Sequence, residues 1–129
     1  MIDCSGQNLF NWLSKYIYPD LVESKSKVSR WDCYSPKYKH RIELKCRKKH
    51  YEKLIIEKSK FDTLTKKAQD NLDTPIYINA TPNGIYRFDL QKVKPIWKIV
   101  NLKKTTNFTN GCRIPKEIAL LSVKDAEIL

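Results

Sequence analysis

Glycine is scarce in this chain of 129 residues, which contains only three. The sequence has neither GxGxxG nor GxxxxGK followed by Ser or Thr, so it does not support dinucleotide binding or P-loop nucleotide chemistry. The cysteines are far apart and form no CxxC pair, which argues against a zinc finger or zinc ribbon. They are Cys4, Cys33, Cys46 and Cys112. We expect reduced thiols, with Cys33 and Cys46 as small core residues.

Long apolar runs are also lacking. No window approaches the roughly 18 consecutive apolar residues of a membrane-spanning helix, so we expect none. The N-terminal residues do not show a basic stretch followed by an apolar run, which is the pattern of a secretory signal. Since neither a signal nor a disulfide framework is indicated, we expect the protein to be cytoplasmic.

Basic residues are abundant: 25 Lys plus Arg oppose 14 Asp plus Glu, a formal net charge of +11. Residues 37–67 alone contain 12 basic and 4 acidic residues, so most of the excess lies in that stretch. A polyanion is therefore the expected partner. No basic amphipathic helix with a strong apolar face is evident, which favours nucleic acid over a membrane surface.

Hydrophobic residues make up 41% of the chain, enough for the core of one domain. Apolar spacing predicts helices over 7–17, capped by Ser5, and over 59–72, capped by Ser59. Strand patterns occupy the segments 28–34, 40–47, 53–58, 75–80, 84–90 and 95–102, and 117–123 adds a short closing element. We expect an α/β fold with a mixed central β-sheet flanked by helices. Its core is expected to span residues 1–102, with 103–129 as a C-terminal extension packed on that core.

Three residues form the most informative pattern. Asp32 is followed, after ten residues and a predicted turn, by Glu43-Leu44-Lys45. Glu43 and Lys45 are two residues apart on a strand and project from the same face, and hairpin pairing would bring Asp32 close to Glu43. Adjacent carboxylates repel each other unless a hard divalent cation lies between them. A nearby lysine can position water or stabilise charge on a phosphate, so the pattern fits metal-assisted phosphodiester hydrolysis.

This D-x10-E-L-K pattern after a first helix resembles the PD-(D/E)XK nuclease superfamily, which includes restriction endonucleases and both phage-type and archaeal Holliday-junction resolvases. The resemblance covers about residues 7–80 and implies a restriction-endonuclease-like core. It implies that Asp32, Glu43 and the backbone carbonyl of Leu44 bind Mg²⁺ or Mn²⁺. Lys45 is then the catalytic lysine. The implied substrate is DNA, cut to leave a 5′-phosphate.

The sequence departs from the superfamily pattern in two places. Trp31 stands before Asp32, where many members have proline. The first predicted helix contains no acid, although many members supply a glutamate from it. Glu23 is the favoured substitute as a third metal ligand, although only weakly, and Asp20 and Glu57 are the alternatives.

The surrounding basic residues suggest how a phosphate backbone would be held. The best phosphate-contact candidates are Lys48, Lys49, Lys58 and Lys60. We therefore expect a small Mg²⁺-dependent DNA endonuclease, structure-selective or non-specific, acting on double-stranded or branched DNA in phage DNA processing, in the host-cell cytoplasm if it is of phage origin. One site cuts one strand, so a chain this short is expected to act as a dimer when it cuts both.

The same residues also have a structural interpretation. Glu43 and Lys45 could form surface ion pairs with Arg30 or Lys39 on a solvated strand face. The alternative function is then a non-catalytic basic nucleic-acid-binding module. The two histidines, His40 and His50, are interpreted as surface or strand-end residues. Tyrosines near the basic stretch could stack on bases or simply cover the hairpin; they are Tyr34, Tyr38 and Tyr51.

Overall fold

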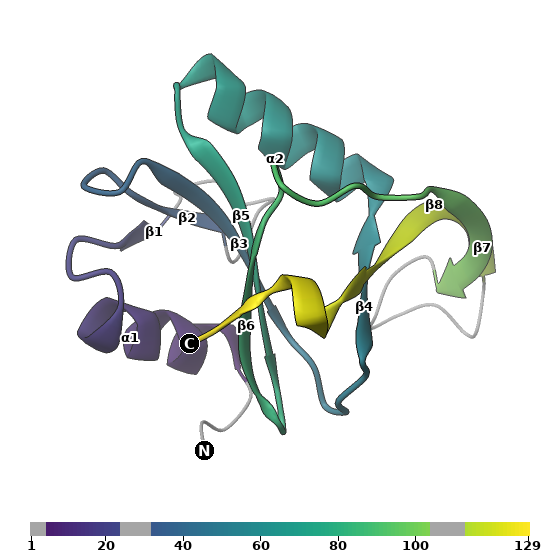
Figure 1. Cartoon of the computed structure of the whole chain (residues 1–129), viewed down its shortest axis with the longest axis horizontal. Helices are drawn as coiled ribbons and strands as arrows, with labels where there is room; N and C mark the ends of the chain where they lie inside the picture. The colour runs from purple at the N-terminus through teal and green to yellow at the C-terminus, as the bar shows by residue number, and fades with distance from the viewer. Residues whose placement is uncertain (1–4, 24–31, 104–112) are drawn as a thin grey trace.

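The computed structural model of the chain describes residues 5–23, 32–103 and 113–129 (Figure 1). The predictions that concern Cys4, Arg30, Trp31, Cys112 and the first part of the strand at 28–34 lie outside these residues.

A mixed sheet forms the centre of the fold (Figure 1). Its strands, in spatial order, are β1 (Val22–Glu23), β2 (Asp32–Ser35), β3 (His40–Cys46), β5 (Thr74–Thr81), β6 (Gly84–Asp89) and β9 (Glu127–Ile128). β3 and β5 are parallel, whereas the other neighbouring strands pair antiparallel. The predicted mixed central sheet is therefore confirmed, and so are the hairpins β2–β3 and β5–β6. Gly84, after the turn at 82–83, has a φ of 155°, which few other residues tolerate.

A smaller antiparallel sheet lies beside the main one, in the order β4 (Lys53–Glu57), β8 (Arg113–Ser122), β7 (Lys98–Lys103). β8 has ten residues, so the short closing element predicted at 117–123 underestimated it. A 3₁₀ turn, η1 (Val123–Asp125), leads from β8 to β9. The residues from 113 onward thus contribute β8 to the smaller sheet and β9 to the main sheet.

Helix α1 (Gly6–Tyr16) covers one face of the main sheet. Its predicted cap is confirmed: the Ser5 Oγ accepts a hydrogen bond from the Asn8 backbone N–H at 3.1 Å. The helix buries Leu9 and Leu13 against the strands, because these positions share one helical face. The strand residues that meet them are Cys33, Ile42, Leu44, Ile76, Ile78, Ala80 and Ile85.

Helix α2 (Lys58–Asp70) and the smaller sheet cover the opposite face of the main sheet. Leu64 and Ala68 are its buried residues. The predicted cap at Ser59 is wrong. β4 passes directly into the helix, so Glu57 occupies the N-cap position without a side-chain hydrogen bond. Asp62 accepts instead from Lys58 Nζ at 2.7 Å.

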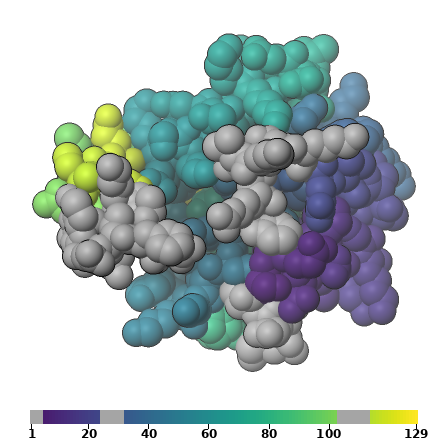
Figure 2. Space-filling model, turned by 180° about the vertical axis from the view of Figure 1, so that it is seen from behind, coloured from purple at the N-terminus to yellow at the C-terminus, as the bar shows by residue number. Residues whose placement is uncertain are grey.

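The space-filling view from behind shows α1, in purple, and the yellow-green strands β7 and β8 at opposite sides of the molecule (Figure 2). Between and above them lie teal-blue residues of the middle of the chain, which include β4 and α2. Within the described residues, no helix combines the length and apolarity needed to cross a bilayer.

Candidate active site

Two carboxyl groups meet on the face of the main sheet that α2 covers. Asp32 on β2 lies directly opposite Glu43 on β3, as hairpin pairing predicts. Their side chains therefore project from the same face of the sheet, close enough for the charge of Asp32 to raise the pKa of Glu43. Neighbouring Cys33 and Ile42 point to the other face, into the core beneath α1. Strand alternation therefore separates a polar face from an apolar one at this point.

The protonation of Glu43 is strongly perturbed. Burial of the carboxyl group raises its pKa to about 7, and the charge and hydrogen bond of Asp32 act in the same direction. Lys60 on α2 opposes the rise, because its Nζ lies 3.8 Å from Glu43 Oε1. Among the described residues, Lys60 is the cation within 4 Å of Glu43, so the surface pair suggested with Lys39 does not form.

Lys45 lies two residues beyond Glu43 on the same face of β3 and is more exposed. Partial desolvation of its ammonium group lowers its pKa, and repulsion from Arg47 adds to that effect. The nearby carboxylates of Glu57 and Glu43 act against the lowering. The lysine thus stands among groups of both signs, beside the carboxyl pair.

Arg47 lies two residues beyond Lys45 on the same face and was not among the predicted site residues. Its guanidinium donates to Asn79 Oδ1 at 3.0 Å, to the Ile55 carbonyl at 2.6 Å and to Tyr77 Oη at 3.0 Å. Tyr77 in turn donates to the same Ile55 carbonyl at 2.9 Å. The alternation of residues 43, 45 and 47 was the available signal, since all three point to one face.

The candidate third acids are not gathered at the carboxyl pair. Glu23 pairs in register with Cys33, whose side chain lies under α1, so it belongs to the opposite face from Asp32. Asp20 instead holds the β2–β3 turn, accepting from the Lys37 N–H and from Ser35 Oγ, each at 2.7 Å. These hydrogen bonds, led by the one from Lys37, lower the pKa of Asp20.

Glu57, the remaining candidate, forms an ion pair with Lys116 at 2.8 Å. Within the described parts of the chain, no three Asp, Glu, His or Cys side chains are grouped to hold a metal ion. The site therefore offers two carboxylates. Their hard oxygen donors suit Mg²⁺ or Mn²⁺, with water in the remaining positions.

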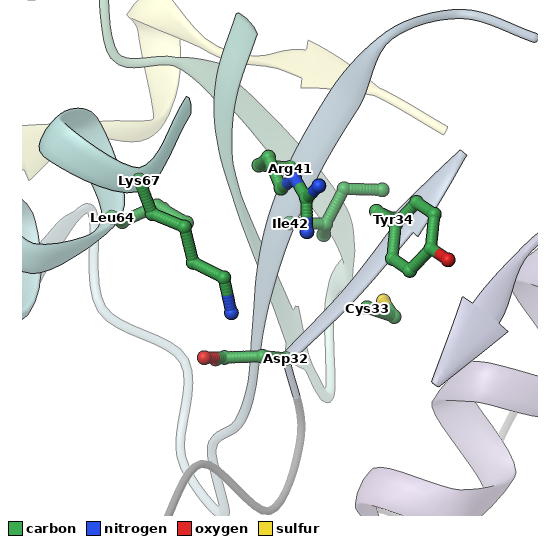
Figure 3. A pocket seen from close by; sticks show the side chains of 7 residues that line it. All are labelled: Asp32, Cys33, Tyr34, Arg41, Ile42, Leu64 and Lys67. Carbon is green, nitrogen blue, oxygen red and sulfur yellow. The ribbon is translucent and has the colours of Figure 1, made fainter. Parts of the chain in front are cut away.

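The predicted phosphate contacts occupy different positions. Lys48 and Lys49 are exposed directly after β3. Lys58 is bound to Asp62, which raises its pKa, and its ammonium lies 5.8 Å from the centre of the Trp97 ring. Lys67 was not predicted, yet its side chain points toward Asp32 across a small pocket (Figure 3).

Comparison with solved structures finds a similar fold in Hjc, a Holliday junction resolvase from the archaeal hyperthermophile Archaeoglobus fulgidus. The match has a TM-score of 0.53 and covers 88% of this chain and 79% of that one. Sequence identity is 13%, so the likeness concerns the fold. It confirms the predicted α/β class with a mixed central sheet. Comparisons with protein-family models and with curated proteins find no match.

Proposed function

We propose that the chain is a divalent-metal-dependent DNA endonuclease of the PD-(D/E)XK superfamily that cuts branched DNA. The observation that carries this proposal is the pairing of Asp32 with Glu43, with Lys45 on the same sheet face. The fold, shared with a Holliday junction resolvase, supports the same class of reaction. The proposal includes structure-selective cutting during phage DNA processing in the cytoplasm.

Asp32 and Glu43, together with the backbone carbonyl of Leu44, are the residues that would hold the metal. A bound Mg²⁺ or Mn²⁺ would supply charge neutralisation at the phosphate and would activate water. The carboxyl pair fits this task because burial and the neighbouring acid disfavour the ionised form of Glu43, and a bound cation would relieve both effects.

Lys45 is placed to orient the attacking water or to stabilise charge on the scissile phosphate. Its lowered pKa reflects desolvation and the adjacent Arg47. Lys48 and Lys49, which follow on the same chain, would contact the DNA backbone. Such contacts position the substrate without reading bases, so we expect selection of a DNA structure and not of a sequence.

Cleavage of a synthetic four-way junction tests this proposal. With Mg²⁺ the protein should cut the junction faster than a linear duplex of the same sequence, and a chelator should abolish cutting. Lys45→Ala should reduce the single-turnover rate by about 100-fold or more, in the range of loss of a transition-state contact. Lys49→Ala is the matched control, and we expect a several-fold effect from one lost phosphate contact.

A different outcome would support the alternative function. Binding that does not depend on metal, without cleavage and unchanged in Glu43→Ala, would identify a non-catalytic basic nucleic-acid-binding module. Circular dichroism of each variant establishes that the fold is intact. Resolution of a junction requires two cuts, so the active species is proposed to be a homodimer, to be checked by sedimentation of the protein–junction complex.

A further inference from the structure

A small pocket lies beside the carboxyl pair, between α2 and the β2–β3 hairpin (Figure 3). Its polar lining comes from Asp32, Tyr34, Arg41 and Lys67. Tyr34 pairs directly with Arg41 across the hairpin, one step along from the pair formed by Asp32 and Glu43. The pocket therefore continues the polar face of the sheet away from the candidate site.

Lys67 reaches this pocket from the sheet-facing side of α2. Lys60, Leu64 and Lys67 are spaced to lie on one helical stripe, and buried Leu64 anchors that stripe to the sheet. Lys60 approaches Glu43, whereas Lys67 points toward Asp32 (Figure 3). The two lysines, about 10 Å apart along the helix axis, thus flank the carboxyl pair.

Lys67 and its neighbour Lys66 differ in whether they form an ion pair. Lys66 lies 3.4 Å from Asp70 on the outer side of α2. Within the residues that the structure describes, no carboxylate lies within 4 Å of Lys67 Nζ. Lys67 is only partly exposed, although it carries no such partner. A half-buried ammonium beside a pocket is well placed to receive an anion.

Arg41 supplies a second, fixed cation. Its Nε donates to Asp73 Oδ2 at 2.6 Å, and its guanidinium lies 4.5 Å from the centre of the Tyr34 ring. These two contacts hold the guanidinium plane in one orientation. Its terminal amino groups have no hydrogen-bond partner elsewhere in the described part of the chain. Such a planar fork suits the oxygens of a phosphate.

We propose that Lys67 and Arg41, which line this pocket, form a DNA subsite for the phosphate next to the one that is cleaved. The pocket itself has room for about one oxygen-sized atom, so the phosphate would lie against the two cations and not inside it. The proposal rests on the proposed function, because Asp32, one of the residues proposed to hold the metal, marks the end of the pocket nearest the proposed cleavage site. Tyr34 is a positioning residue that holds the Arg41 guanidinium. Phosphate is favoured over a carboxylate ligand because both cations lie beside a candidate phosphodiesterase centre.

Lys67→Ala and the matched control Lys66→Ala test the subsite. Binding of the four-way junction is measured without divalent metal over a range of salt concentrations, so that it does not depend on cleavage. Lys67→Ala should weaken binding about three- to ten-fold and reduce the slope of log K against log salt by about one, as expected for one phosphate contact. Lys66→Ala should leave both close to the wild-type values.

A second measurement locates the contact. Neutral methylphosphonates are placed singly at each phosphate flanking the mapped cleavage position. One substitution adjacent to the cut should weaken wild-type binding but leave binding by Lys67→Ala unchanged, because the contact is already lost.

The outcomes separate this inference from the proposed function. Equal binding by the two lysine variants, with cleavage intact in the wild type, would overturn the subsite and leave the nuclease proposal standing. A wild type that binds but never cleaves would contradict the nuclease proposal, and the salt-dependent binding of Lys67→Ala compared with Lys66→Ala would still decide whether Lys67 contacts a phosphate. A wild type that does not bind the junction would contradict both.

Discussion

At the scale of single residues, the negative charge of Glu43 is costly to the fold. Its carboxyl group is partly buried beside Asp32, and these effects raise its pKa to about 7. At higher pH the folded protein must hold a second negative charge there, offset in part by Lys60. Glu43→Gln should therefore raise the free energy of unfolding at about pH 8 by about 1–2 kcal/mol, measured by urea denaturation. Cleavage should be lost in the same variant.

Glu52→Gln is the matched control, because the Glu52 side chain is 77% exposed. Its stability should change little, as is usual for exposed charges. A Glu43→Gln variant less stable than the wild type at this pH would show that the ion pair with Lys60 outweighs the repulsion from Asp32.

At the scale of elements, Arg47 connects the two sheets. It lies just after β3 and bonds to Asn79 and Tyr77 of β5, and also to the Ile55 carbonyl of β4. Arg47→Ala would remove three hydrogen bonds from a charged donor and leave the buried Asn79 amide oxygen without that partner. We expect a loss of about 2–3 kcal/mol in the free energy of unfolding, measured by urea denaturation.

Lys48→Ala, at the next and exposed position, provides the comparison for loss of a positive charge alone. If both variants lose the same small amount of stability, the contacts of Arg47 do not stabilise the fold. Arg47→Lys separates charge from geometry, since lysine cannot reproduce the guanidinium fork and should restore only part of the loss.

Local signals allowed part of this fold to be predicted. The β2–β3 and β5–β6 hairpins follow from alternation and turn residues that lie within a few positions of each other. The juxtaposition of Asp32 and Glu43 follows from the first of these hairpins.

Long-range pairing could not be predicted in the same way. β4 pairs with β8, about sixty residues later in the chain, and no local pattern specifies that partner. The start of α2 was misplaced for a related reason. The strand continues into the helix through Glu57, a residue that is not a preferred cap. Lys67 was missed because its role depends on a pocket formed with another element.

At the scale of the whole molecule, a polar cluster links the end of α1 to distant strands. Tyr18 Oη lies 2.8 Å from His40 Nδ1, at the start of β3. Arg87 of β6 donates to the same hydroxyl at 3.1 Å and to Glu127 of β9 at 2.9 Å. A charged imidazole would face the Arg87 guanidinium, which donates to the same hydroxyl, so the cluster favours a neutral His40.

Acid should therefore loosen the cluster. Burial of His40 lowers its pKa, and the charge of Arg87 acts in the same direction; Asp89, Glu127 and Asp73 only partly oppose this. The unfolded chain then binds a proton at a higher pH than the folded one. The stabilising contribution of His40 is complete above about pH 6.5 and is lost as the pH falls toward the lowered folded value.

Urea denaturation of the wild type and of His40→Asn between about pH 7.5 and pH 5 measures this loss. One proton taken up on unfolding changes the free energy by at most about 1.4 kcal/mol per pH unit. The wild type should lose more stability than the variant over this range. Glu43 titrates in the same range with the opposite sign, but it is present in both proteins, so the difference between them isolates His40. Parallel profiles for the wild type and His40→Asn would show that the cluster tolerates a charged imidazole.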